Sequence, residues 1–304
     1  MSNNYYNNFY NNTDKDDKDL PPPYNQFSPQ TSISSSSASS YMAGVNVPIA
    51  ANDNRTREEK YREIINRHEI SLYYSQKLQS LYSFKIVFIF DDSGSMNTSL
   101  NESPLNTSMY KATRWDELQY FSKISIELAN IFNENGSDAY FLNRPAVRNV
   151  KNIDQLMPHF HSRPAGFTPL TRVLKNVLND NCSRFLQEGK LLIVIITDGE
   201  PTDDNGKVDI RDFKRALKDR HRNVYTTIVS ATDDHTTMKY LDDWDVTIPR
   251  LDVVDDFRSE RAQIMKHKGS GYRFTFGDYV VKSMVGSIDS SIDHKDEATN
   301  CSVS

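Results

Sequence analysis

Hydrophobic residues gather in short uninterrupted runs at several points along the chain. The strongest runs cover residues 85–90, 191–196 and 224–230. Runs of this length are typical of strands that are buried on both faces of a sheet. Two weaker strands are predicted at residues 139–142 and 146–150. The pattern therefore predicts a sheet that is covered on both sides.

Between these runs, apolar residues recur every three or four positions, as they do on one face of a helix. In one segment, Leu170, Val173, Leu174 and Val177 form such a stripe. Helices are predicted at residues 57–81, 115–132, 153–160, 169–185, 210–220, 235–243, 256–268 and 278–288. Strands that alternate with helices predict an α/β fold, with a doubly wound, mostly parallel central sheet and helices on both faces.

Composition divides the chain into four regions. Residues 1–55 are polar and include seven serines between positions 31 and 40, so they contain too little apolar surface to offset the entropy of ordering. We expect this region to be a disordered tail. Residues 56–82 are expected to form a leading helix packed on the domain, and residues 83–290 the domain itself. Residues 291–304 are expected to form a loose C-terminal tail.

Bulk properties exclude several classes of function and location. The net charge of the 304-residue chain is −5, which gives no support to a nucleic-acid partner. No apolar run approaches the ~20 residues that span a bilayer, and the segment after Met1 lacks a signal-peptide pattern. The two cysteines, Cys182 and Cys301, cannot form a disulfide framework. A cytoplasmic location is therefore expected.

Five small oxygen-bearing residues stand where predicted elements begin or end. Asp91, Ser93 and Ser95 follow the first strand, Thr168 precedes a predicted helix, and Asp198 follows the strand at 191–196. The carboxyl ends of parallel strands are where α/β folds bind ligands. Carboxylate and hydroxyl oxygens suit a hard dication, so a site for Mg²⁺ or Mn²⁺ is predicted here.

The order Asp-x-Ser-x-Ser, then Thr, then Asp resembles the metal-ion-dependent adhesion site of von Willebrand factor type A domains. The resemblance covers roughly residues 80–290, and the loop at 91–96 resembles that of intracellular members from fungi and other lower eukaryotes. It implies that the two serines and Thr168 are direct ligands, while the aspartates bind directly or through water. It also implies an open metal position that captures a carboxylate from a protein partner.

Other interpretations of these residues stay open. Asp and Ser at strand ends often only cap helices, and Thr168 before Pro169 suits a cap. A metal-assisted phosphohydrolase using Asp91 or Asp92 is a second hypothesis. However, phosphotransferases of the haloacid dehalogenase type need a second Asp where Ser93 stands, and no Walker, His-Glu-x-x-His or Gly-x-Ser-x-Gly motif occurs. A non-enzymatic protein is therefore expected, with Asp92 pointing away from the ion.

A proline motif lies in the predicted tail. Pro21, Pro22, Pro23 and Tyr24 match Pro-Pro-x-Tyr, in which a polyproline II segment and a tyrosine dock in the aromatic groove of a WW domain. The resemblance implies WW-domain ubiquitin ligases as partners. The alternative is a stiff polar linker. A third hypothesis for the whole protein follows: an adaptor that acts through its tail, with a passive folded domain.

Overall fold

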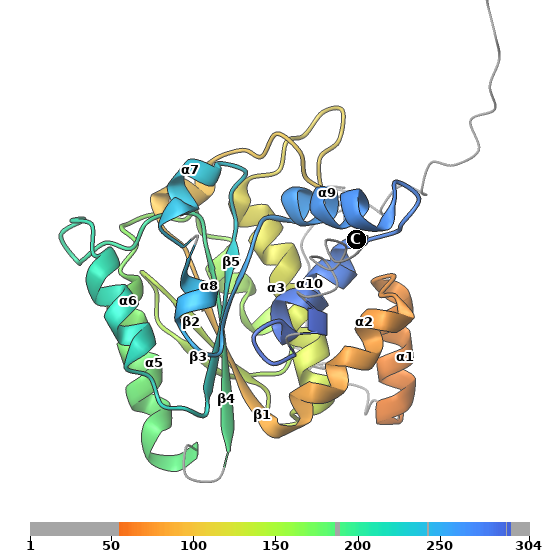
Figure 1. Ribbon diagram of the computed structural model, residues 1–304, viewed down its shortest axis with the longest axis horizontal. Coiled ribbons are helices and arrows are strands. Elements are labelled where there is room, and N and C mark those ends of the chain that lie inside the picture. The colour runs from red at the N-terminus through yellow and green to blue at the C-terminus, as the bar shows by residue number, and fades with distance from the viewer. Residues whose placement is uncertain (1–54, 186–188, 242, 290, 293–304) are drawn as a thin grey trace, which may run out of the picture. The chain divides into compact units, whose positions relative to one another are not determined.

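Six strands form one sheet in the order β3-β2-β1-β4-β5-β6, with helices on both faces (Figure 1). The structure is a computed structural model, and it describes residues 55–185, 189–241, 243–289 and 291–292. All neighbouring strands are parallel except β3, which runs antiparallel to β2 at one edge. The predicted α/β fold with a mostly parallel sheet is confirmed. The proline motif lies outside the described residues.

Five of the six strands match predicted runs. The strands are β1 Phe84–Phe90, β2 Ser137–Phe141, β3 Val147–Val150, β4 Lys190–Thr197, β5 Val224–Ser230 and β6 Leu251–Val254. The sequence analysis predicts no strand at β6, because Asp252 interrupts a run of only four residues. In the structure this aspartate is only 6% exposed, and β6 pairs with β5 at the other edge of the sheet.

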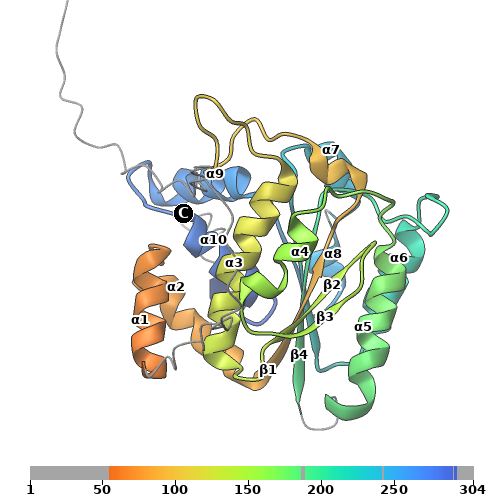
Figure 2. The same ribbon diagram turned by 180° about the vertical axis from the view of Figure 1, so that it is seen from behind.

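The helices pack in two layers, one on each face of the sheet (Figures 1 and 2). They are α1 Arg57–Arg67, α2 Leu72–Lys77, α3 Arg114–Phe132, α4 Met157–Phe160, α5 Leu170–Phe185, α6 Ile210–Lys218, α7 His235–Met238, α8 Trp244–Thr247, α9 Phe257–Lys268 and α10 Phe276–Val285. One core cluster joins the sheet to α1, α2, α3, α4, α9 and α10. The other joins it to α5, α6, α7 and α8. Each apolar helix stripe therefore has a sheet face to cover.

Residues of β1 alternate between the two cores. Ile86, Phe88 and Phe90 belong to one cluster, whereas Val87 and Ile89 belong to the other. All five side chains are fully buried. This two-sided burial explains why residues 86–90 form a continuous apolar run, because none of these five positions faces water.

The strand order reverses at β1. The chain runs from β1 through α3 to β2 on one side, and later places β4 on the other side of β1. In open α/β sheets, ligands bind outside the carboxyl ends of the strands at such a reversal. The residues that follow β1 and β4, namely Asp91 and Asp198, flank this point.

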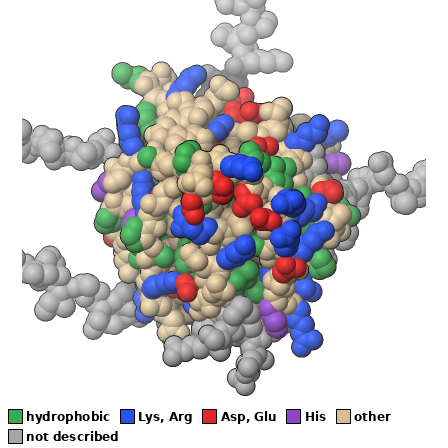
Figure 3. Space-filling view, turned by 90° about the vertical axis from the view of Figure 1, so that its left-hand side faces the viewer, with side chains coloured by type: hydrophobic (Ala, Val, Ile, Leu, Met, Phe, Trp, Pro, Cys, Tyr) green, Lys and Arg blue, Asp and Glu red, His purple; other side chains and the backbone are tan. Residues whose placement is uncertain are grey.

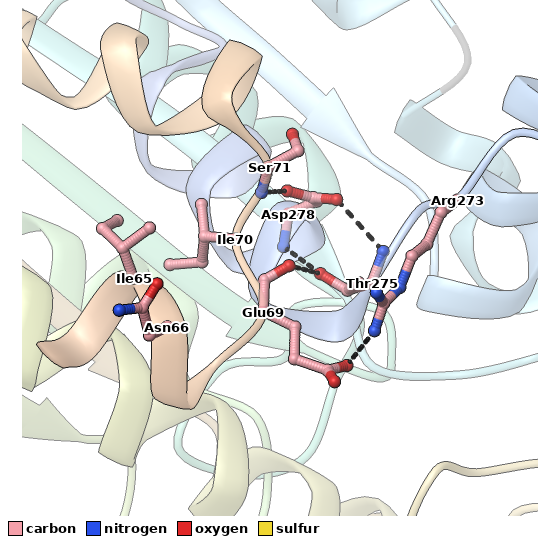
Figure 4. Close-up of a pocket in the computed structure, with 8 residues that line it drawn as sticks. All are labelled: Ile65, Asn66, Glu69, Ile70, Ser71, Arg273, Thr275 and Asp278. Atoms are coloured by element: carbon pink, nitrogen blue, oxygen red, sulfur yellow. Dashed lines mark hydrogen bonds and ion pairs between the residues drawn. The ribbon is translucent and has the colours of Figure 1, made fainter. Parts of the chain in front are cut away.

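The leading segment is not the single helix predicted at residues 57–81. It bends after α1, where Glu69 has a φ of 53°, and α2 starts again with Ser71 as its cap. The bend packs against α10, where the Ser71 backbone N donates to Asp278 Oδ1 at 2.7 Å. A hollow of about 400 Å³ lies at this corner, between α1, the bend and the start of α10 (Figure 4). The prediction was wrong because a contact more than 200 residues away sets the bend.

The last helix starts two residues before the predicted 278–288 and ends earlier. Thr275 and Asp278 form a reciprocal capping box, in which each side chain bonds the other residue's backbone N–H, so α10 begins at Phe276. The helix predicted at residues 235–243 is instead two short pieces, α7 and a 3₁₀ turn at Lys239–Leu241. Local capping therefore decides where α10 begins.

The face that carries α5 and α6 presents Lys and Arg among Asp and Glu rather than one sign of charge (Figure 3). Arg172 pairs with Asp204 on this side at 2.8 Å. None of the described helices combines the length and apolar character needed to cross a bilayer.

Candidate metal site

Asp91 is buried and directly follows β1. Its backbone N still donates to Ile196 O of β4 at 3.0 Å, so the residue is held in the line of the strand. Asp91 Oδ1 accepts from the backbone N of Ser93 at 2.9 Å, and Oδ2 accepts from Thr197 Oγ1 at 2.6 Å. The side chain is fully buried. These two bonds fix the carboxylate and turn the chain toward Ser93.

Ser95 connects the loop after β1 to the residue after β4. Ser95 Oγ donates to Asp198 Oδ1 at 2.7 Å, and it lies 3.1 Å from Ser93 Oγ. Ser93 and Asp198 are buried, whereas Ser95 is exposed to solvent. Three predicted ligands from two segments about 100 residues apart thus form one connected set of oxygens.

Thr168 is held beside the same loops by backbone contacts. The Gly94 backbone N donates to Gly166 O at 3.1 Å, which joins the serine loop to the threonine loop. The Thr168 backbone N donates to Thr202 Oγ1 at 3.0 Å, and Thr202 N donates back to Thr168 O at 2.9 Å. Thr202 stands four residues after Asp198. The threonine loop is therefore tied to both other segments, and Thr168 itself is 8% exposed.

Asp91 and Asp198 are two buried carboxylates close enough to influence each other. Burial, together with the neighbouring Asp198 carboxylate, raises the pKa of Asp91 to about 7. A dication would offset both the cost of burying the Asp91 charge and its repulsion by Asp198, because it favours both ionised carboxylates. The hydroxyls of Ser93 and Ser95 add neutral oxygens of the kind that Mg²⁺ and Mn²⁺ accept. The residues present therefore fit a hard divalent ion.

The site contains fewer carboxylates than a storage site for metal ions. In the part of the chain that the structure describes, no group of three or more His, Cys, Asp or Glu side chains is placed to hold a metal ion. A dication at Asp91 and Asp198 would need hydroxyls, waters or an external oxygen to complete about six ligands. This composition favours an ion that keeps an exchangeable position.

Asp92 supports the loop rather than the cluster of oxygens. Its side chain is fully buried, and Oδ1 accepts from the backbone N of Asn143 at 2.8 Å. Arg144 Nε lies 3.3 Å from Asp92 Oδ2, and Ala165 N donates to Asp92 O at 2.8 Å. Asp92 therefore ties the loop to the end of β2 and to the segment before Thr168. Neither Asn143 nor Arg144 was recognised from the sequence.

Arg114 was also missed, and it touches the site directly. Its Nη1 donates to Asp198 Oδ2 at 2.7 Å, and the Arg114 side chain is only 11% exposed. The residue is the first of α3, after the cap Thr113. The sequence does mark Arg114 as unusual, because the start of a helix carries partial positive charge and usually attracts acidic rather than basic residues.

Comparison with known proteins gives only distant similarities. The sequence matches no protein-family model and no curated protein. Among solved structures, the pilus adhesin SpaC from Lactobacillus rhamnosus GG has 14% identity and a TM-score of 0.38, over 66% of this chain and 31% of the adhesin. Manganese-loaded TRAP from Plasmodium vivax has 14% identity and a TM-score of 0.34, over 59% of this chain and 72% of TRAP. The chain spans about a third of the adhesin's length, and the interpretation of the site rests on its own residues.

Proposed function

We propose that this protein is a non-enzymatic interaction module that binds an acidic group of a protein partner through a Mg²⁺ or Mn²⁺ ion. The proposed ligands are Asp91, Ser93, Ser95, Thr168 and Asp198. The observation that carries the proposal is the bond from Ser95 Oγ to Asp198 Oδ1 at 2.7 Å, which joins the ends of β1 and β4 at the strand-order reversal. Oxygen ligands from separate loops converge at the place where such sheets bind ligands.

The chain's own residues would divide the work in this site. The ion would supply a Lewis acid that attracts one more oxygen ligand. Asp91 and Asp198 supply only two of the roughly six oxygen ligands that a dication prefers, so a carboxylate from a partner could complete its coordination. Ser95 is exposed and marks the side from which a partner would approach, whereas Asp91 is fully buried and would bind the ion from the protein interior.

We also propose that the segment Pro21, Pro22 and Tyr24 gives a second contact, with WW domains. The support is the motif itself, because a preformed polyproline II segment loses little entropy on docking. Deletion of residues 20–25 should then remove partners whose capture does not depend on the metal ion. If all partners were lost by that deletion and none by metal-site substitution, the tail-driven adaptor would be the better description.

The metal-binding part is tested by calorimetric titration of Mn²⁺ into the intact protein. Thr168→Val should weaken Mn²⁺ binding at least tenfold, since one oxygen ligand is lost. Thr226→Val is the matched control: Thr226 is a fully buried threonine in the middle of β5, and its hydroxyl lacks a hydrogen-bond partner among the described residues. The control should bind Mn²⁺ as tightly as the unaltered chain.

Partner binding is tested by affinity capture in Mg²⁺ and in EDTA, with both variants in parallel. Partners held only in Mg²⁺ and lost in Thr168→Val, but kept in Thr226→Val, support the proposal. Absence of Mn²⁺ binding by the unaltered chain would refute it. Turnover of a simple phosphate ester that disappears in Asp91→Asn would instead favour the phosphohydrolase hypothesis.

A further inference from the structure

Both oxygens of the Asp198 carboxylate are already engaged. Oδ1 accepts from Ser95 Oγ at 2.7 Å, and Oδ2 accepts from Arg114 Nη1 at 2.7 Å. Asp198 is 1% exposed, so little water reaches this pair. Attraction between a buried carboxylate and a guanidinium is much stronger than between the same groups on the surface. Arg114 thus provides a positive charge at the place where a metal ion would provide one.

Arg114 is fixed at its backbone but has a freer head group. Its backbone N donates to Thr98 O at 3.0 Å, and it follows the capped residue Thr113 at the start of α3. Its Nε is buried and has no hydrogen-bond partner in the described part of the chain. The guanidinium is therefore held mainly by Asp198, and loss of that bond would leave the helix start unchanged.

A second acceptor lies within electrostatic reach of Arg114. Hydrogen bonds from Thr236 lower the pKa of the Asp234 carboxyl, and the charge of Arg114 adds to this lowering. Asp234 is exposed, at the start of α7. The positive charge of Arg114 is therefore felt at Asp234 as well as at Asp198.

We propose that Arg114 is a built-in competitor for the divalent ion at Asp198 and that it sets the ion affinity of the site. The inference rests on the proposed function, because it needs the ion to bind there. Arg114 must release Asp198 Oδ2 before that atom can bind an ion. Where the ion used only Oδ1 or a water, the guanidinium charge would still repel it. The site therefore holds its ion more weakly than its oxygen ligands alone would allow.

The test is calorimetric Mn²⁺ titration of the full chain with Arg114→Gln. This variant should bind Mn²⁺ at least tenfold more tightly than the unaltered protein, because one positive charge is removed from Asp198. Arg172→Gln is the matched control: it also removes an arginine charge, but Arg172 pairs with Asp204 at 2.8 Å and not with the site. Its Mn²⁺ affinity should change less than twofold.

A second readout does not need the bound ion. In EDTA, Arg114→Gln should unfold at a lower temperature than the unaltered protein, because Asp198 is left buried with its partner charge gone. Saturating Mn²⁺ should remove most of this difference. Arg114→Met, which fills similar space without charge, is measured in parallel so that the result does not depend on one variant folding.

The outcomes separate the inference from the function on which it rests. Equal or weaker Mn²⁺ binding by Arg114→Gln and Arg114→Met, with normal binding by the unaltered chain, would overturn the competitor role and leave the metal site standing. An equal gain in Arg172→Gln would overturn it too, since general charge would then be the cause. Absence of Mn²⁺ binding in every variant would refute both.

Discussion

Lys282 and Glu260 form an ion pair in the protein interior, between α10 and α9. Lys282 Nζ lies 2.7 Å from Glu260 Oε2, and the two side chains are only 8% and 6% exposed. Burial raises the pKa of Glu260 from its ordinary value of 4.5, although the Lys282 charge opposes the rise. Each of these two buried charges is therefore stabilised by the opposite charge of its partner.

Lys282→Met is expected to destabilise the protein by about 3–5 kcal/mol, because it leaves the Glu260 carboxylate buried and unpaired. Urea denaturation at neutral pH measures this loss. The double variant Lys282→Met/Glu260→Leu removes both charges and should recover most of the stability. A single variant as stable as the unaltered protein would show that Glu260 is not dependent on Lys282.

The same variant should gain stability as the pH falls. Glu260 has a folded-state pKa above its unfolded value, so the folded protein binds more protons than the unfolded chain between these two values. Its contribution is therefore fully present below about pH 4.5 and is lost as the pH rises through the folded-state pKa. Without Lys282 this dependence should steepen. Unfolding curves between pH 5 and 8 would check the direction, with a shallower slope expected for the double variant, which lacks Glu260.

The residues of the candidate site differ in how far the sequence reveals them. Asp91 and Asp198 could be placed because each follows an apolar strand, and parallel strands end at one edge. Arg114 stands out in the sequence only as a basic residue at a helix start, and its contact with Asp198 depends on how α3 packs against the sheet. The sequence predicts that Asp92 points away from the ion but not which residues it contacts. In the structure it accepts a hydrogen bond from the backbone N of Asn143 and so holds the loop in place.

Gly277 decides how two elements fit together. A Cβ at this position would lie 2.2 Å from His68 O, at the bend between α1 and α2. The leading helices also contact the segment after α10 through Lys77, whose Nζ lies 2.7 Å from Asp289 Oδ2. Close backbone contact at Gly277 is therefore the condition for α1 and α2 to pack on α10.

Gly277→Ala should destabilise the protein, because the added methyl forces His68 and the bend away from α10. The expected loss is about 1–3 kcal/mol, the usual cost of overpacking a tight contact. Thermal or urea unfolding measures it. Gly271→Ala is the control, since a Cβ there meets nothing within 4 Å. Equal stability of both variants would mean that the corner yields at no cost.

Element existence could be predicted more fully than element ends. The long strands are recognisable as continuous apolar runs, and the amphipathic α5 by apolar residues every three or four positions. Both patterns arise because burial requires apolar residues at particular positions. The bend at Glu69 carries no such signal: the segment keeps helical spacing, and only its contact with α10 breaks it. β6 is missed for a related reason, since the neighbouring strand β5 makes Leu251–Val254 a strand despite its aspartate.

At the scale of the whole molecule, the proposed ion would link the two central strands. An ion that binds only the folded chain stabilises it by about 2.7 kcal/mol at about 100 times its Kd. Mn²⁺ should therefore raise the unfolding temperature of the intact protein, and removal of the ion by EDTA should reverse the rise. Asp198→Asn should abolish the response. A response unchanged in that variant would place the bound ion elsewhere.

The central position of β1 also governs how amide protons exchange with solvent. β1 pairs with β2 on one side and β4 on the other, and helices cover both of its faces. Amides in such a strand exchange only when the whole fold opens, whereas the bend at Glu69 can open locally. Exchange at Phe88 and Ile89 should therefore report global stability. The base of the proposed metal site is then the stiffest part of the molecule, and adaptation to a partner has to come from the loops that follow β1 and β4.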